Sequence, residues 1–243
     1  MDTQTQKNTN EDFSEQQCWR CNKMFQAKIV DNGQERHWQD TCNDCWTPEF
    51  EIEFQEKKER LIEERKERLR ESIEKHWLQV CPPLYRDTDP SRLPQNQLKE
   101  AMKWEYGPKG LLFHGPTGTG KTRIAWQVMK KLIDSDRRIT AFDSTDFVNT
   151  CAEKFMEGAG NSWVNKLIKC QLLFIDDLGN EPSGERGAGE IFHIIKRRGE
   201  EMLPVIITTN SVGTELAGKL RGPEDRGSAL VRRLREFCTP IAF

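Results

Sequence analysis

The chain has 243 residues, 31% of them charged and 35% hydrophobic, with a formal net charge of -2 at pH 7. This near-neutral balance excludes a global basic field that would attract nucleic acid, so any DNA contact must come from local patches. No apolar run approaches the ~18 residues of a membrane span, and the first residues lack the basic-then-apolar order of a signal peptide. We therefore expect a cytoplasmic protein without membrane contact.

The N-terminal part divides into a tail and a cysteine module. Residues 1–17 are polar and are expected to be disordered, because they offer little to bury. Residues 18–48 contain two Cys-x-x-Cys pairs separated by twenty residues, a spacing typical of a structural Zn²⁺ site. Asp31-Asn32-Gly33 predicts a hairpin turn between the two pairs. The predicted zinc ligands are Cys18, Cys21, Cys42 and Cys45.

Other interpretations of this module stay open. His37 could replace one thiolate, or the four thiols could be unrelated to one another. Trp19, Trp38 and Trp46 either pack around the metal or stay exposed for contact with a partner or DNA. A fold of about thirty residues has too small a core to be stable alone. Zn²⁺ would therefore supply the folding free energy, on the order of 10–16 kcal/mol.

A charged connector helix is predicted over residues 49–78, because Glu and Lys/Arg recur there at i,i+4 spacing. Its apolar side chains form only a thin stripe, so it is either a solvated connector or a helix that docks on a partner. The prolines that follow Cys81 end the helix, and the next domain is expected to span residues 79–243. The stripe consists of Leu61, Leu69, Ile73 and Trp77.

A phosphate-binding loop follows a short apolar strand at Gly110–His114 and precedes a helical pattern over 123–133. Strand, glycine-rich loop and helix are the context that identifies a P-loop for ATP. Backbone N–H groups and the helix N-terminus would hold the phosphates. The lysine would reach the β- and γ-phosphates, and the last threonine would ligate Mg²⁺. The nucleotide-binding residues are Gly115, Pro116, Thr117, Gly118, Thr119, Gly120, Lys121 and Thr122.

Two further apolar strands end in polar side chains that suit ATP hydrolysis. Residues 171–175 lead into Asp176 and Asp177, and residues 203–209 lead into Asn210. Because doubly wound sheets bind ligands at the carboxyl ends of their strands, we expect Asp176 to hold Mg²⁺ and Asp177 to orient or deprotonate the attacking water. Asn210 would lie near the γ-phosphate, or would merely cap its strand.

An arginine cluster lies on the predicted helix 226–235, whose Leu230 and Leu234 are expected to face inward. An arginine here either lies on a basic surface or reaches the ATP of a neighbouring subunit as an arginine finger.

These motifs together resemble the AAA+ ATPases, and among them the DnaC-like helicase loaders and the IstB-like transposition ATPases, over residues 80–243. The resemblance implies an α/β core with a parallel sheet, an arginine finger acting in trans within a self-assembled complex, and Arg233 as the first candidate for it, with Arg232 next. Unlike many AAA+ ATPases, the chain is not expected to carry a helical lid after the last strand at 237–243. The resemblance also implies contact of residues 147–169 with single-stranded DNA, with packing of their aromatic rings in the core as the alternative. That segment offers Lys154, Phe155, Trp163, Lys166 and Lys169.

The function predicted first is loading of a replicative helicase hexamer onto single-stranded DNA, with ATP hydrolysis as the switch. The alternative is an IstB-like regulator of transposition that binds duplex DNA and a transposase. A P-loop kinase for a small metabolite is the third hypothesis, disfavoured by the strand that ends in Asn210 and by the arginine cluster.

Overall fold

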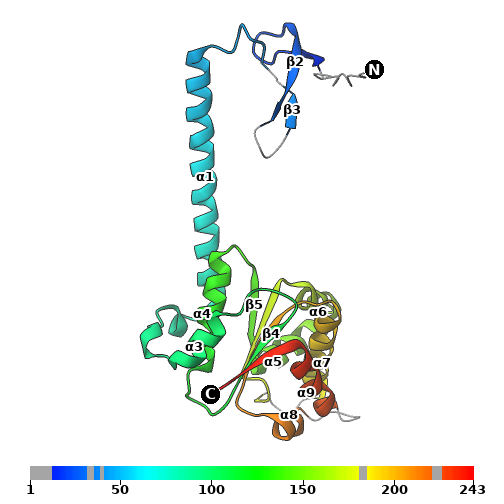
Figure 1. The fold of residues 1–243 in the computed structure, drawn as a ribbon. Helices are drawn as coiled ribbons and strands as arrows, with labels where there is room; N and C mark the ends of the chain where they lie inside the picture. The colour runs from blue at the N-terminus through cyan, green and yellow to red at the C-terminus, as the bar shows by residue number, and fades with distance from the viewer. Residues whose placement is uncertain (1–12, 32–35, 39–40, 181–184, 221–225) are drawn as a thin grey trace, which may run out of the picture. The chain divides into compact units, whose positions relative to one another are not determined.

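The computed structural model describes residues 13–31, 36–38, 41–180, 185–220 and 226–243. The chain separates into two compact units, Met1–Arg68 (the N-terminal unit) and Leu69–Phe243 (the C-terminal unit), drawn in Figure 1. Among the helices described, none is both long and apolar enough to cross a membrane.

The N-terminal unit contains a small antiparallel sheet in the order β1-β2-β3. Residues 13–17 were expected to be disordered, but they form β1, because pairing with β2 satisfies their backbone hydrogen bonds without an apolar core. Residues 1–12 and most of the predicted hairpin turn lie outside the described residues. The strands are β1 (Phe13–Gln17), β2 (Met24–Asp31) and β3 (Arg36–Trp38).

Helix α1 (Pro48–Val80) begins in the N-terminal unit, and its last residues belong to the C-terminal unit. It ends at Val80 rather than at residue 78, directly before Cys81 and the two prolines that cannot continue it. Side chains of the predicted apolar stripe have two different environments: Leu61 and Leu69 are exposed, whereas Trp77 is buried in the core of the C-terminal unit.

The C-terminal unit is built on a five-stranded sheet in the order β5-β6-β7-β4-β8, with every neighbouring pair parallel. The strands are short, and the three central ones, β6, β7 and β4, are largely buried, as expected when helices cover both sides of a parallel sheet, whereas the edge strands β5 and β8 are more exposed. This confirms the predicted α/β class. The strands are β4 (Gly110–His114), β5 (Ile139–Asp143), β6 (Leu172–Asp176), β7 (Val205–Thr209) and β8 (Cys238–Ala242).

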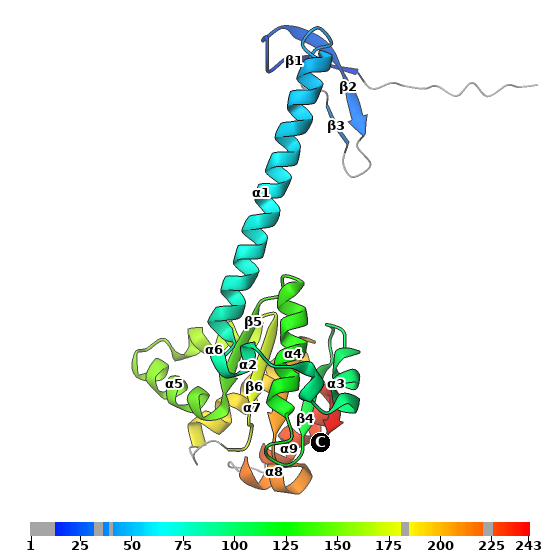
Figure 2. The same ribbon diagram turned by 90° about the vertical axis from the view of Figure 1, so that its left-hand side faces the viewer.

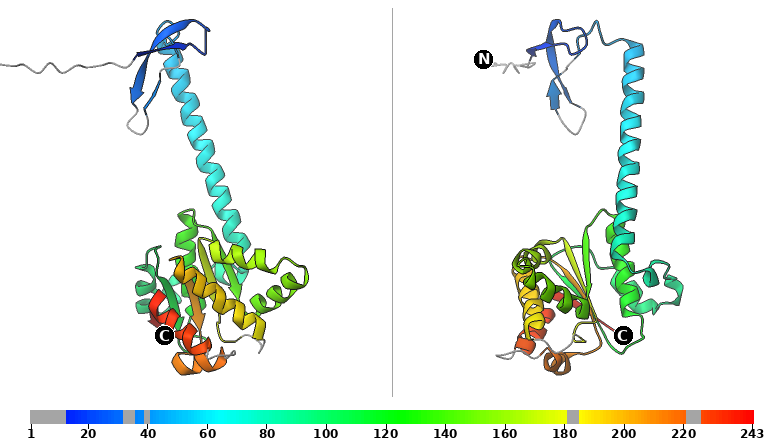
Figure 3. Two further views of the ribbon diagram at one scale, coloured as in Figure 1. Left: turned by 90° about the vertical axis from the view of Figure 1, so that its right-hand side faces the viewer. Right: turned by 180° about the vertical axis from the view of Figure 1, so that it is seen from behind.

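Helices cover the two faces of this sheet with separate apolar clusters. One cluster joins α4 to the end of α1, and the other joins α5, α6, α7, α8 and α9; Figure 2 and Figure 3 show these two layers within the unit. The first layer has α2 (Pro83–Arg86), η1 (Pro90–Arg92), α3 (Gln95–Met102) and α4 (Lys121–Asp134). The second has α5 (Ser144–Met156), α6 (Gly160–Lys169), α7 (Glu185–Glu200), α8 (Gly213–Lys219) and α9 (Arg226–Phe237).

Arg198 of α7 is fully buried, although no sequence pattern marked it. Its guanidinium donates hydrogen bonds to carbonyl oxygens at the end of α6 and in the segment after it, 2.8 Å to Leu167 and 2.8 Å to Cys170. It also donates to the carbonyl of Pro204, at 2.6 Å, directly before β7. Because the last carbonyls of a helix lack partners within it, one arginine here satisfies several buried acceptors at once.

Candidate nucleotide-binding site and cysteine cluster

The phosphate-binding loop connects β4 to α4 in a backbone conformation that needs glycine. Gly120, the N-cap of α4, has φ 96°. Gly115 has φ 141°, and a Cβ at this position would lie 2.5 Å from the carbonyl oxygen of Phe243. Glycine at both positions lets the loop wrap tightly before the helix begins, so the N-terminus of α4 opens toward the place where phosphates would bind.

Lys121 lies inside this loop, with only 5% of its surface exposed. Its Nζ donates to the carbonyl oxygens of Gly115 at 2.8 Å and Pro116 at 2.7 Å, and to Asn210 Oδ1 at 2.8 Å. Burial lowers the pKa of the Lys121 ammonium, and the carboxylates of Asp177 and Asp176 oppose that shift. The loop therefore holds a cation at the position where a P-loop lysine meets the β- and γ-phosphates.

Asp176, at the end of β6, faces the P-loop threonine. The Thr122 hydroxyl donates to Asp176 Oδ1 at 2.9 Å, and the Thr208 hydroxyl donates to the same oxygen. Burial raises the pKa of the Asp176 carboxyl, against the two threonine hydrogen bonds that lower it. Hydroxyl and carboxylate oxygens at this spacing fit Mg²⁺, whose charge would offset the cost of burying the carboxylate.

Asp177 and Asn210 complete a hydrogen-bonded chain across the ends of β6 and β7. Asn210 Nδ2 donates to Asp177 Oδ1 at 3.3 Å, and the backbone N–H of Asp177 donates to Thr208 Oγ1 at 2.8 Å. Asp177 has φ 52°, a left-handed conformation that is strained for a residue with a Cβ. The chain Lys121–Asn210–Asp177 thus links the loop to an acid held in an unfavourable backbone conformation.

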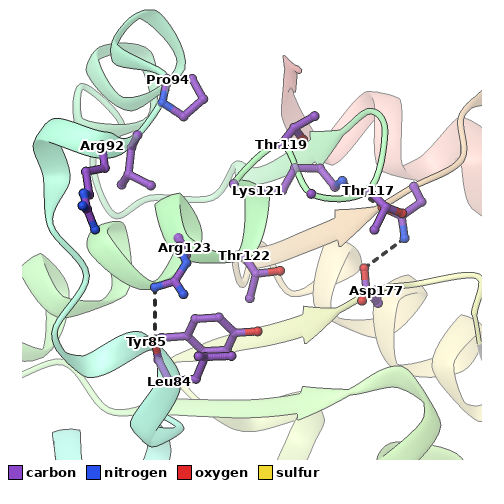
Figure 4. A pocket seen from close by; sticks show the side chains of 14 residues that line it. Leu84, Tyr85, Arg92, Pro94, Thr117, Thr119, Lys121, Thr122, Arg123 and Asp177 are labelled. Atoms are coloured by element: carbon purple, nitrogen blue, oxygen red, sulfur yellow. Dashed lines mark hydrogen bonds between the residues drawn. The ribbon is translucent and has the colours of Figure 1, made fainter.

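The pocket beside the loop has a volume of about 400 Å³ and a wall that sequence motifs did not predict. This wall comes from residues 84–94 and includes Tyr85 and Arg92. The Arg123 guanidinium lies 5.6 Å from the Tyr85 ring centroid and donates to the Leu84 carbonyl at 3.2 Å, as Figure 4 shows. Two features of the sequence could have pointed to this wall. One is the proline-rich stretch, which was used solely to place the domain boundary, and the other is Arg123, directly after Thr122.

The two arginine-finger candidates lie outside this pocket. Arg232 is exposed on α9, whereas Arg233 is half-buried and its Nε has no hydrogen-bond partner in the part of the chain that is described. Leu230 and Leu234 of the same helix are both buried, as the helical spacing predicted.

The segment predicted to contact single-stranded DNA uses its aromatic rings for packing. The half-buried Trp163 contacts the rings of Phe142 and Phe147, with centroid distances of 5.6 Å and 5.2 Å. Lys154 pairs with Glu157 at 2.7 Å, so this cation is already engaged within the helix end. Trp163 therefore packs against the second apolar cluster with part of its ring exposed, and contact of this segment with single-stranded DNA stays a prediction.

The four cysteines of the two Cys-x-x-Cys pairs form one cluster, with all Sγ atoms within 4.8 Å of one another. The Sγ atoms of Cys21 and Cys42 lie 3.7 Å apart, and tetrahedral Zn²⁺ with bonds of ~2.3 Å requires about 3.8 Å. Burial raises the pKa of the Cys18 thiol, but backbone hydrogen bonds, led by the N–H of Cys42, bring it down to about 6. Hydrogen bonds from its neighbouring thiols raise the pKa of Cys45 to about 12. The spacing of the four thiols fits Zn²⁺.

Two of the three tryptophans of the module have described side chains, and both are partly exposed. Trp19 is 59% exposed and donates from Nε1 to Thr41 Oγ1 at 2.7 Å, and Trp46 is 39% exposed. The side chains of His37 and Trp38 lie outside the described part of the chain.

Residues 56–242 match the family model described as "IstB-like ATP binding protein". The ATP-binding protein of insertion sequence IS5376 from Geobacillus stearothermophilus is 29% identical over 126 residues. That alignment covers 52% of this chain and 49% of the relative, so the chain spans about half of the relative's length.

Two solved structures share this fold. DnaI superimposes with a TM-score of 0.56 and 21% identity, over 67% of this chain and 94% of that one. The DnaC helicase loader superimposes with a TM-score of 0.52 and 23% identity, over 70% and 98%. At this identity the two structures establish the fold alone, and that fold is the AAA+ core that the sequence motifs resembled.

Proposed function

Because the chain belongs to the family of IstB-like ATP-binding proteins, and is therefore an AAA+ ATPase, we propose that it loads a replicative helicase onto single-stranded DNA and uses ATP hydrolysis as its switch. The observation that carries the switch is the hydrogen-bonded chain Lys121–Asn210–Asp177. It joins the residue that binds phosphate to the residue that faces the attacking water, so occupancy of one changes the contacts of the other.

In this proposal each residue has one task in hydrolysis. Lys121 leaves the loop carbonyls and Asn210 to bind the β- and γ-phosphates. Asn210 Nδ2 carries two N–H groups: one donates to the γ-phosphate, and the other holds Asp177 beside it. Asp177 orients the water and accepts its proton. Thr122 and Asp176 hold Mg²⁺, which would neutralise charge on the phosphates when bound.

The arginine finger is proposed to act on the neighbouring subunit. A position outside the chain's own pocket is what a trans role requires, and α9 presents Arg232 and Arg233 there. Arg233→Ala is expected to keep nucleotide binding and to lose turnover by about 10³-fold or more, whereas Lys121→Ala loses productive ATP binding itself. Steady-state phosphate release beside equilibrium binding of a fluorescent ATP analogue separates the two. Normal turnover of Arg233→Ala would transfer the role to Arg232, which the same assay tests.

Two findings support a loader. The described core corresponds to nearly the whole length of the solved chains of the DnaC helicase loader and of DnaI. The chain also has a separate N-terminal unit with a cysteine cluster, which would serve as an adaptor to the helicase. Single-stranded DNA and a hexameric helicase are then the expected partners.

A second candidate has an observation of its own. The relative with 29% identity belongs to an insertion sequence, which favours a regulator of transposition that assembles on duplex DNA with ATP and recruits a transposase. The ATP site and the arginine finger would be the same in both.

One experiment separates the two candidates. The purified protein is mixed with the replicative helicase hexamer of its own source, with and without ATP, and complexes are detected by co-elution. An ATP-sensitive complex that also places helicase on single-stranded DNA supports the loader. No complex, together with ATP-dependent coating of duplex DNA, supports the transposition regulator and rejects the loader.

A further inference from the structure

An apolar groove lies within the N-terminal unit, between the first cysteine pair and α1. Its volume is about 450 Å³, and it is separate from the nucleotide pocket. Trp19 reaches it from between Cys18 and Cys21, while α1 supplies the rest. The lining residues are Trp19, Phe50, Glu53, Phe54, Lys57, Lys58, Leu61, Ile62 and Arg65.

The floor of the groove is apolar and exposed. Trp19 is 59%, Phe54 42% and Leu61 56% exposed. Phe50 contacts both neighbouring rings, with centroids 6.2 Å from Trp19 and 6.1 Å from Phe54. The floor residues of α1 recur at a spacing of about four and seven, so they share one face of the helix. A contiguous apolar strip on an otherwise charged helix marks a surface that another protein covers.

The rim of the groove is basic. Lys57, Lys58 and Arg65 line it against one acid, Glu53. Throughout the described residues these three cations form no ion pair, whereas Glu63 and Glu64 of the same helix pair with Lys66 and Arg68. The charge left over on the rim is therefore positive, and an occupant that neutralises it must be acidic.

We propose that this groove binds an amphipathic, acidic helix of a partner protein. The lined part of α1 runs from 50 to 65, about 22 Å at 1.5 Å per residue, which matches about four turns of a second helix. Apolar side chains of the occupant at i, i+4 and i+7 contact the floor, and its acidic side chains contact Lys57, Lys58 and Arg65. The surface is distinct from the nucleotide site and does not depend on which of the two proposed functions is correct.

The test uses a fluorescein-labelled helical peptide with leucines at i, i+4 and i+7 and flanking glutamates, and a twin peptide with lysines in place of the glutamates. Both are titrated with the full-length, zinc-loaded protein, and binding is followed by fluorescence anisotropy. We expect the acidic peptide to bind at micromolar concentration and the basic twin to bind more weakly by about tenfold or more. Equal binding of the two peptides, or no binding of the acidic one, overturns the proposal.

Three variants localise the binding. Leu61→Glu is expected to weaken the acidic peptide about tenfold or more, while Ile52→Glu, on an equally exposed apolar residue of α1 that does not line the groove, leaves it unchanged. The double variant Lys58→Glu/Arg65→Glu is expected to reverse the preference toward the basic twin. A second copy of the chain is the competing occupant, and sedimentation of the protein tests for it. A dimer that is lost in Leu61→Glu and kept in Ile52→Glu would assign the groove to this second copy and overturn the proposal.

Discussion

The two units of this chain obtain their stability from different sources. The C-terminal unit has two apolar clusters on the faces of its sheet, and all five residues of β7 are buried. In the described part of the N-terminal unit the buried apolar side chains are few, and two of them, Cys18 and Cys42, belong to the cysteine cluster. One unit is therefore stable through apolar burial, and we expect the other to depend on the Zn²⁺ that its four thiols fit.

The largest expected effect comes from removing the metal. A strong Zn²⁺ chelator, or Cys45→Ser, is expected to unfold the N-terminal unit, because the metal contributes on the order of 10–16 kcal/mol. The C-terminal unit should keep its thermal transition and its ATP binding. Metal analysis, limited proteolysis and binding of a fluorescent ATP analogue in one sample report all three. Resistance of residues 13–68 to protease after chelation would contradict the expectation that the N-terminal unit depends on the metal.

The next effect is a test of the C-terminal unit alone. Arg198→Met is expected to cost about 3 kcal/mol or more in the free energy of unfolding, because several buried carbonyl oxygens lose their donor. Arg197→Met is the matched control: its exposed ion pairs with Glu200 and Glu201 should cost about 0.5 kcal/mol or less. Urea denaturation of both variants measures the difference, and equal costs would show that Arg198 does not cap α6.

A smaller effect is expected at the strained acid. Asp177→Gly removes the cost of a left-handed residue with a Cβ and is expected to raise the free energy of unfolding by about 1 kcal/mol, while ATP turnover is lost. Asp136 has φ 59° on an exposed turn after the C-terminal end of α4 and does not line the pocket, so Asp136→Gly should stabilise by a similar amount and keep turnover. If both variants lose turnover, the loss in Asp177→Gly would be attributed to the relief of backbone strain and not to removal of the Asp177 carboxylate.

The smallest effect is a pH dependence at the end of α1. His76 Nε2 accepts from the backbone N–H of Ile139 at 3.0 Å, so the neutral ring is required. Burial lowers the pKa of His76 below 6.5, and Arg138 adds to this while Asp136 opposes it. The unfolded chain then binds more protons, so stability is complete above pH 6.5 and falls as pH drops below it. His76→Gln keeps an acceptor, and its melting temperature should fall less between pH 7.5 and 5.5. If the melting temperature of His76→Gln falls with pH as steeply as that of the unaltered protein, His76 is excluded as the source of the pH dependence.

Prediction from sequence succeeded where local chemistry fixes the geometry. The α/β class followed from apolar runs that end in polar residues, and β4 spans the predicted residues Gly110–His114. The pocket wall at Tyr85 and the capping role of Arg198 could not be predicted, because both depend on contacts between segments far apart in the chain. The segment that contains Trp163 has the basic and aromatic composition expected of a DNA-binding surface, yet Trp163 packs against Phe142. Composition alone does not distinguish a ring that stacks on bases from a ring that packs against the core.

The position of β4 in the sheet has a consequence for synthesis of the protein. The P-loop strand pairs with β7 on one side and β8 on the other, and both are encoded far downstream of it. When the P-loop of a nascent chain has emerged from the ribosome, neither strand that pairs with β4 has yet been synthesised. Because non-local strand pairing is slow and must await the later segments, the ability to hold ATP would arise only after β7 and β8 have both been synthesised.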